Sequence, residues 1–155
     1  MSRVAVDLLG GDGAPEVVAD AVAAIADQPG IDLVLVGPPD AVPALLSRRG
    51  IDPARFPVLP AHAVVPMDAD PLTALRGPGG ADLSAAVAAA AVRDGLADAW
   101  VTAGHTGAAV AAAALTLGRV RGMNRPALAV VLPAMAGPVV LVDAGASLDA
   151  NADTL

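Results

Sequence analysis

Short runs of branched apolar residues alternate with longer alanine-rich stretches along this chain, and three of the runs end directly in a turn of glycine and small polar residues. The three turns are Gly10–Gly13, Gly104–Gly107 and Asp143–Ser147. A strand that enters a helix through such a turn is typical of βαβ units around a parallel sheet. The pattern therefore predicts an α/β protein with a doubly wound, mostly parallel sheet.

The positions of the elements follow from the same alternation. Strands are expected at Val4–Leu8, Leu33–Val36, Pro57–Leu59, Ala99–Thr102, Ala127–Leu132 and Val139–Val142, and helices at Pro15–Ala26, Ala41–Arg48, Pro71–Arg76, Leu83–Arg93 and Thr106–Leu117. The last two strands are close enough in sequence to form a hairpin, so the sheet is expected to be mixed. We expect Val4–Leu8, Ala99–Thr102 and Val139–Val142 to share one sheet, with the loops that follow them at one edge.

The composition bounds the class of protein. The 155 residues suit one domain spanning 1–155, and no apolar stretch reaches the roughly 18 residues that a membrane-spanning helix needs. Cysteine is absent and no secretory signal precedes Val4, so a cytoplasmic location is predicted. A net charge of −7 argues against a nucleic-acid partner, because such binding depends on clustered Lys and Arg. The strand and loop before Leu155 lack a closing helix, which predicts a sheet that continues in a longer protein.

The glycine turns are the candidate sites. Glycine lets the backbone approach a ligand closely, and the free N–H groups at the start of a helix attract anions. The Gly104–Gly107 turn adds the side-chain donors of His105 and Thr106 and is the expected anion-binding loop. Gly10, Gly11 and Asp12 are expected to line a second side of the same anion site. Neither turn matches a dinucleotide fingerprint or a P-loop, so no nucleotide cofactor is expected.

The other polar residues favour structural roles. With two histidines and no cysteine, the chain offers no metal-ligand cluster. His62 lies in a proline-rich loop, and Asp68 and Asp70 before Pro71 are typical of helix-capping carboxylates. The basic cluster Arg119–Arg125 is either a solvated surface or a surface for an acidic partner.

At these loops the chain resembles the phosphate acyltransferases of bacterial phospholipid synthesis (the PlsX type). The resemblance rests on segments that occur in the family's order. They are Val4–Asp7 with Gly10–Asp12, Pro15–Val18, Val65–Asp68 with Pro71 and Ala74–Arg76, Ala103–Ala108, Arg125–Leu128 with Leu132-Pro133, and Asp143–Ala146. Each segment by itself is weak, whereas all of them in register are specific.

The resemblance implies a fold shared with isocitrate- and isopropylmalate-type dehydrogenases, here its N-terminal half, and no cofactor. It implies transfer of a fatty acyl group from acyl-acyl carrier protein to inorganic phosphate, in a homodimer with peripheral membrane association through the missing half. His105 and Thr106 would be the catalytic residues. The substrate- and phosphate-binding residues would be Gly10, Gly11, Asp12, Gly104, Gly107, Asp143, Gly145 and Ser147.

The chain also departs from the family pattern. His105 and Ser147 stand where the family has asparagine, and Gly77–Gly80 replaces a basic run. Two other functions therefore stay open. One is a phosphotransacetylase-like enzyme that uses coenzyme A, and the other is a non-catalytic fragment or paralogue that binds anions. A comparison of binding to acyl carrier protein and to coenzyme A separates the phosphotransacetylase-like enzyme from the acyl-acyl carrier protein enzyme.

Overall fold

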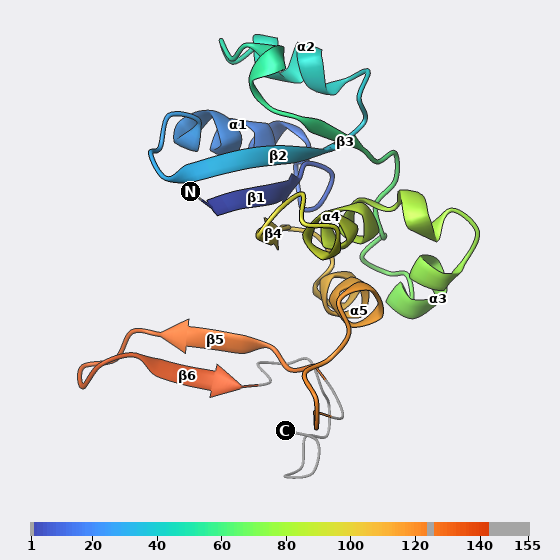
Figure 1. Cartoon of the computed structure of the whole chain (residues 1–155), viewed down its shortest axis with the longest axis vertical. Coiled ribbons are helices and arrows are strands. Elements are labelled where there is room, and N and C mark those ends of the chain that lie inside the picture. The colour runs from blue at the N-terminus through green and yellow to red at the C-terminus, as the bar shows by residue number, and fades with distance from the viewer. Residues whose placement is uncertain (1, 124–125, 143–155) are drawn as a thin grey trace. The chain divides into compact units, whose positions relative to one another are not determined.

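The structure is a computed structural model that describes residues 2–123 and 126–142. It divides into two compact units, with the boundary between Leu117 and Gly118. The first unit contains a four-stranded sheet and its helices, and the second contains a two-stranded sheet (Figure 1).

The sheet of the first unit is parallel throughout. Its strands are β1 (Ser2–Asp7), β2 (Ile31–Gly37), β3 (Val58–Pro60) and β4 (Ala99–Val101), arranged in the order β3-β2-β1-β4. In the register, Val4 of β1 lies between Leu33 of β2 and Ala99 of β4. The apolar runs of β1 and β2 are continuous because a parallel sheet is covered on both faces.

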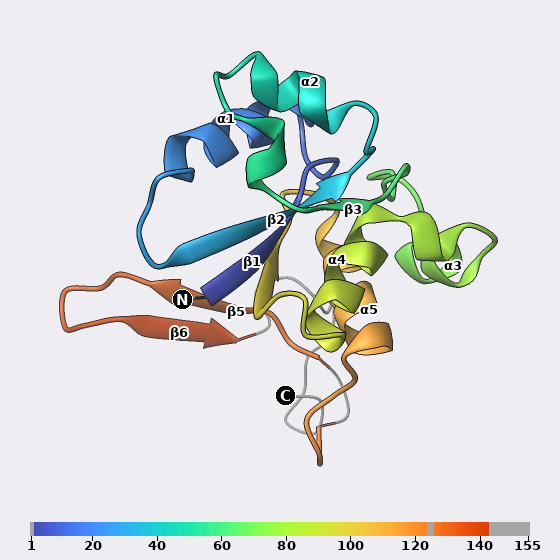
Figure 2. The same ribbon diagram turned by 45° about the horizontal axis from the view of Figure 1, so that its top comes forward.

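Helices lie on both faces of this sheet (Figure 2). Helices α1 (Glu16–Ile25) and α2 (Val42–Ser47) cover one face, where Leu35, Val22 and Leu46 belong to a common core. On the other face α4 (Ser84–Arg93) packs against Ala5 and Val36 through small alanine side chains. This double covering confirms the doubly wound α/β class.

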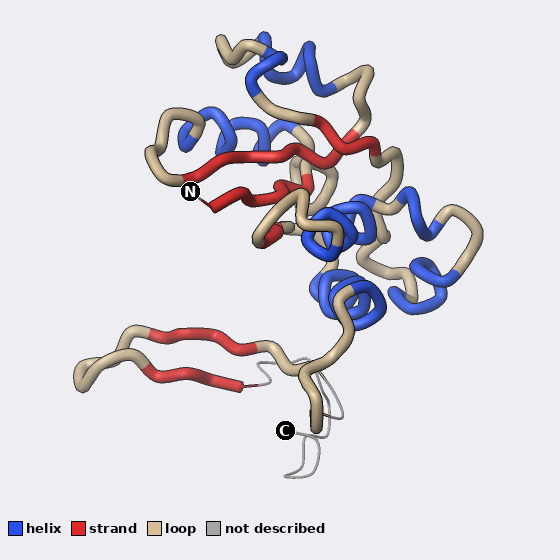
Figure 3. Tube along the Cα trace, in the orientation of Figure 1, coloured by secondary structure: helices blue, strands red, loops and turns tan. Residues whose placement is uncertain are grey.

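Two further helices complete the unit, as the tube in Figure 3 shows. Helix α3 (Pro71–Arg76) begins after Asp70, whose carboxylate accepts a hydrogen bond from Thr73 N at 2.7 Å. The capping role expected of Asp70 is therefore confirmed. Helix α5 (Thr106–Thr116) packs on α4 through Ala112, which contacts Ala85 and Ala89. Short 3₁₀ turns at Pro53–Arg55 and Gly80–Asp82 connect the elements.

The second unit contains a hairpin of β5 (Ala129–Leu132) and β6 (Val139–Val142), paired antiparallel. The expected hairpin is thus confirmed. The expectation that Val139–Val142 joins the sheet of β1 and β4 is wrong, because β6 pairs with β5 in a separate sheet. The six-residue connection between β5 and β6 favours antiparallel pairing of neighbours in sequence over a crossover to a distant parallel strand.

The expected element boundaries agree with the structure to within two residues, and α3 and β6 have the expected limits. Within the described ranges, no helix is both long enough and apolar enough to cross a membrane.

Candidate functional site

The glycine turns after β1 and β4 lie against each other, as expected for loops at the carboxyl edge of a parallel sheet. The contact is so close that it excludes side chains at its centre. A Cβ atom at Gly10 would lie 2.5 Å from Thr102 Oγ1 and 2.8 Å from Gly104 N, and one at Gly104 would lie 3.1 Å from Gly10 Cα. A side chain at position 10 would therefore force the turns apart, and one at position 104 would require its neighbours to shift by a few tenths of an ångström.

A buried carboxylate holds the two turns together. Asp7, the last residue of β1, is 1% exposed. Its Oδ1 accepts hydrogen bonds from Leu9 N at 3.0 Å and Gly10 N at 3.2 Å, and its Oδ2 accepts one from Thr102 Oγ1 at 2.7 Å. Thr102 Oγ1 in turn accepts a hydrogen bond from Gly104 N at 3.0 Å. Asp7 and Thr102 thus fix the backbone of both turns, and each buried polar atom in the network has a partner.

His105 is the N-cap residue of α5. Its Nδ1 accepts a hydrogen bond from Ala108 N at 3.3 Å, and its carbonyl oxygen accepts from Ala108 N and Ala109 N. An Nδ1 that accepts carries no proton, so the neutral ring carries its proton on Nε2. His105 therefore provides the cap acceptor with one ring nitrogen and a hydrogen-bond donor with the other.

The first turn of α5 keeps free donors. Within the described residues, the N–H groups of Thr106 and Gly107 make no hydrogen bond to the protein. These are the groups that a helix start leaves unsatisfied and that attract an anion together with the helix dipole. A Cβ atom at Gly107 would lie 2.9 Å from His105 Cε1, so glycine lets the imidazole lie over this turn.

A small cavity of about 120 Å³ lies between the two turns and the segment before α3. Gly11, Asp12, Gly104 and His105 line it, together with Leu9 and the segment Val64–Met67. The cavity is large enough for a tetrahedral anion. Among its described lining residues the only ionised side chain is the carboxylate of Asp12, so the donors available to an anion there are backbone N–H groups and the His105 ring.

The structure thus brings most of the expected site residues together. Gly11, Asp12, Gly104 and His105 line the cavity, Gly10 lies in the contact between the turns, and Thr106 and Gly107 form the first turn of α5. Asp143, Gly145 and Ser147 lie outside the described residues. His62 is exposed and pairs with Asp82, with 2.9 Å between Nδ1 and Oδ1, away from this cavity.

Two residues of the site were missed by sequence reasoning alone. Asp7 is the last residue of β1, and Thr102 directly follows β4; each precedes a glycine turn, and the register places them side by side because Val6 pairs with Val101. A polar residue at the carboxyl end of an apolar parallel strand was the signal available in the sequence. An aspartate there commonly accepts from the backbone N–H two residues later, as Asp7 does from Leu9.

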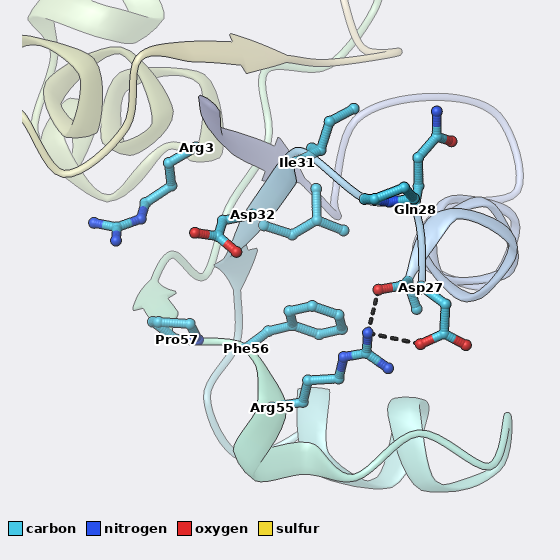
Figure 4. Close-up of a pocket in the computed structure, with 11 residues that line it drawn as sticks. Arg3, Asp27, Gln28, Ile31, Asp32, Arg55, Phe56 and Pro57 are labelled. Carbon is cyan, nitrogen blue, oxygen red and sulfur yellow. Dashed lines mark hydrogen bonds and ion pairs between the residues drawn. The ribbon is translucent and has the colours of Figure 1, made fainter. Parts of the chain in front are cut away.

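A cavity of about 520 Å³ lies elsewhere in the first unit. It is lined by residues that begin β1 and β2, including Arg3, Ile31 and Asp32, and thus lies at the opposite end of the strands from the glycine turns. Arg55 on its wall binds the Ala26 carbonyl oxygen and Asp27, and lies over the Phe56 ring at 5.3 Å (Figure 4). These contacts give Arg55 a structural role. Among the described residues, no group of three or more His, Asp or Glu side chains is placed to hold a metal ion.

Comparison with known proteins shows the family of the chain. The family model described as "Fatty acid synthesis protein" matches residues 2–155. A "Phosphate acyltransferase" of Desulfitobacterium hafniense (strain Y51) is 44% identical over 156 residues, which cover 100% of this chain and 45% of the relative. Similar proteins of the same name occur in Desulforudis audaxviator (45% identical; 95% of this chain, 42% of the relative) and Nostoc punctiforme (40% identical; 95% and 43%). The chain spans less than half the length of these relatives.

Proposed function

The chain belongs to the fatty acid synthesis protein family, and from this we propose that it supplies the phosphate-binding loops of a phosphate acyltransferase. The substrates proposed are acyl-acyl carrier protein and inorganic phosphate, and the product is acyl phosphate. The observation that carries the proposal is the pair of glycine turns that meet beside the free N–H groups of α5. The name of the relatives gives phosphate as the acyl acceptor.

In the proposed reaction a phosphate oxygen attacks the carbonyl carbon of the thioester. A C–O bond forms and the C–S bond breaks, and the carrier leaves as a thiol with the proton that the attacking hydrogen phosphate gives up. The protein's contribution is to hold phosphate against the carbonyl and to stabilise the charge that develops on the carbonyl oxygen. The N–H groups of Thr106 and Gly107 and the His105 Nε2–H are the donors proposed for this task.

The arrangement of His105 favours donation over general-base catalysis. A base would need an unprotonated Nε2, and the ring proton would then lie on Nδ1, facing the N–H of Ala108. His105 thus combines the cap acceptor and the donor that an asparagine amide would supply at this position. We propose that its replacement of the family's asparagine keeps both contacts.

Binding of phosphate by the 155-residue chain tests the site. We expect the melting temperature to rise with sodium phosphate but not with sodium chloride at equal ionic strength. Gly104→Val should abolish the phosphate-dependent shift, because a side chain at this position collides with Gly10 and separates the turns. Ala114→Leu, on α5 but distant from its first turn, is the control that should keep the shift.

If Gly104→Val does not fold, Gly107→Ala gives the same test, since its methyl group displaces the His105 ring. A phosphate-dependent shift that is equal in wild type and both variants would place the anion elsewhere and contradict the proposed site.

A further inference from the structure

The β5–β6 ribbon of the second unit is apolar on both of its faces. Side chains of paired residues lie on the same face, so Ala129, Val131, Val140 and Val142 form one face and Val130, Leu132, Val139 and Leu141 form the other. None of these eight residues is polar. The seven larger side chains are 38% to 65% exposed, with Val131 and Val140 at 65% and 58% on one face and Leu141 at 48% on the other.

Such a ribbon needs protein on both sides. An antiparallel sheet with one solvated face alternates apolar and polar residues, whereas an uninterrupted apolar strand is typical of a sheet covered on both faces. Two strands alone are at best marginally stable in water. Among the described strands, β5 and β6 pair only with each other, so each also presents one row of unpaired backbone N–H and C=O groups.

These features distinguish between the classes of partner. A lipid surface covers elements that have one apolar and one polar face, and hydrocarbon does not accept an open strand edge. A second copy related by two-fold symmetry covers the same patch on each molecule, so one face and one edge would stay open. A polypeptide that adds strands at an edge and packs on both faces satisfies all of the exposed groups.

We propose that the β5–β6 ribbon is the binding surface for the polypeptide that the relatives carry outside the matched stretch. The matched stretch covers only 42% to 45% of these relatives, so more than half of each relative lies outside it. That segment pairs with a free edge of the ribbon and covers its two faces. This inference concerns assembly and holds whether or not the glycine turns bind phosphate.

The test uses the 155-residue chain and, as the probe, the unmatched remainder of the Desulfitobacterium hafniense relative, co-expressed so that both fold together. We expect the two polypeptides to co-purify and the amide hydrogens of β5 and β6 to exchange more slowly in the complex. Val140→Asp on one face and Leu141→Asp on the other should each weaken binding at least about tenfold, because each buries an unpaired carboxylate.

Leu96→Asp is the matched control, since Leu96 in the first unit is 47% exposed, close to the 48% of Leu141. It should leave binding unchanged. Val140→Thr, which keeps the side-chain shape, repeats the test if the aspartate variants do not fold.

Several results would overturn the inference. They are the absence of a complex, a complex that Leu96→Asp weakens as much as Leu141→Asp, or a loss confined to one face. Dimerisation of the chain alone that Val140→Asp abolishes, without binding of the remainder, would identify a second copy as the partner. Ribbon-dependent binding to phosphatidylglycerol vesicles, again without binding of the remainder, would identify a lipid surface.

Discussion

Asp7 and Thr102 show how single residues position a backbone site without lining its cavity. The carboxylate of Asp7 accepts from two amides of its own turn and from the hydroxyl of Thr102, which in turn accepts from the second turn. Because Asp7 is 1% exposed, the loss of one of these bonds is not compensated by water. The geometry of the glycine turns therefore depends on two side chains that make no direct contact with a ligand in the proposed reaction.

Replacement of Thr102 by valine tests this dependence. Thr102→Val keeps the side-chain shape but removes the donor to Asp7 and the acceptor for Gly104 N. We expect the free energy of unfolding to fall by about 1–3 kcal/mol, the cost of leaving buried polar groups unsatisfied. Urea unfolding measures the change. Thr116→Val is the control, and an equal loss in both variants would show that the network contributes nothing specific.

Asp70 gives a pH dependence with a definite sign. Hydrogen bonds from the side chain and backbone N–H of Thr73 hold the pKa of Asp70 below its ordinary value of 3.8. A carboxyl whose pKa is lower in the folded state adds stability above its unfolded pKa and loses it as the pH falls through the folded pKa. Relative to Asp70→Asn, whose cap does not titrate, wild type should lose stability below pH 3.8. Melting temperatures of wild type and Asp70→Asn between pH 5 and pH 2 measure this loss. Equal falls of the two melting temperatures with pH would contradict the capping role of the Asp70 carboxylate.

Among the elements, α4 and α5 depend on alanine for their close approach. Ala85 and Ala89 of α4 meet Ala112 of α5, and Ala89 and Ala112 are 0% and 1% exposed. Small residues let the helices approach closely and place the first turn of α5 next to the glycine turn after β1. The abundance of alanine in these helices thus has a packing role.

Enlargement of this contact should disturb it. Ala89→Leu inserts three carbon atoms between packed helices, and we expect a loss of about 1–3 kcal/mol of unfolding free energy. Ala114→Leu makes the same change at a partly exposed position of α5 and should have little effect. Chemical unfolding compares the stabilities of the two variants. Equal stability would show that the contact between α4 and α5 accommodates a leucine side chain.

At the scale of the whole molecule, the charges of the chain are separated along the sequence. The net charge is −7, yet residues 99–142 contain Arg119, Arg121 and Arg125 and no acidic residue. Among the described residues that line the cavity at the glycine turns there is no arginine, and Asp12 is the one ionised side chain. The described part of the proposed phosphate site therefore offers N–H donors and none of the cations that commonly stabilise a phosphate in acyl or phosphoryl transfer.

We accordingly predict that the 155-residue chain alone forms no acyl phosphate above the uncatalysed rate. The assay incubates the chain with phosphate and either acyl-acyl carrier protein or acyl-coenzyme A, and traps acyl phosphate with hydroxylamine. Addition of the unmatched remainder of the relative should restore product formation with acyl-acyl carrier protein. Turnover by the chain alone would show that the described donors suffice, and turnover with coenzyme A alone would favour the phosphotransacetylase-like alternative.

The sequence by itself determined the elements and the loops that matter. Hydrophobic periodicity and glycine positions are local signals, so the limits of β1, α3 and α5 and the approach of the turns at Gly11 and Gly104 could be predicted from them. The order of the strands in the sheet could not be predicted from local signals. The same holds for β6, which pairs with β5 and does not join the sheet that contains β1 and β4.

Only the tertiary structure revealed that Asp7 and Thr102, 95 positions apart, share a hydrogen bond. It also revealed that the His105 ring caps α5 through Nδ1. Such contacts depend on which strands become neighbours and on the close approach of backbones. Packing of the whole core sets both, and no short stretch of sequence encodes them.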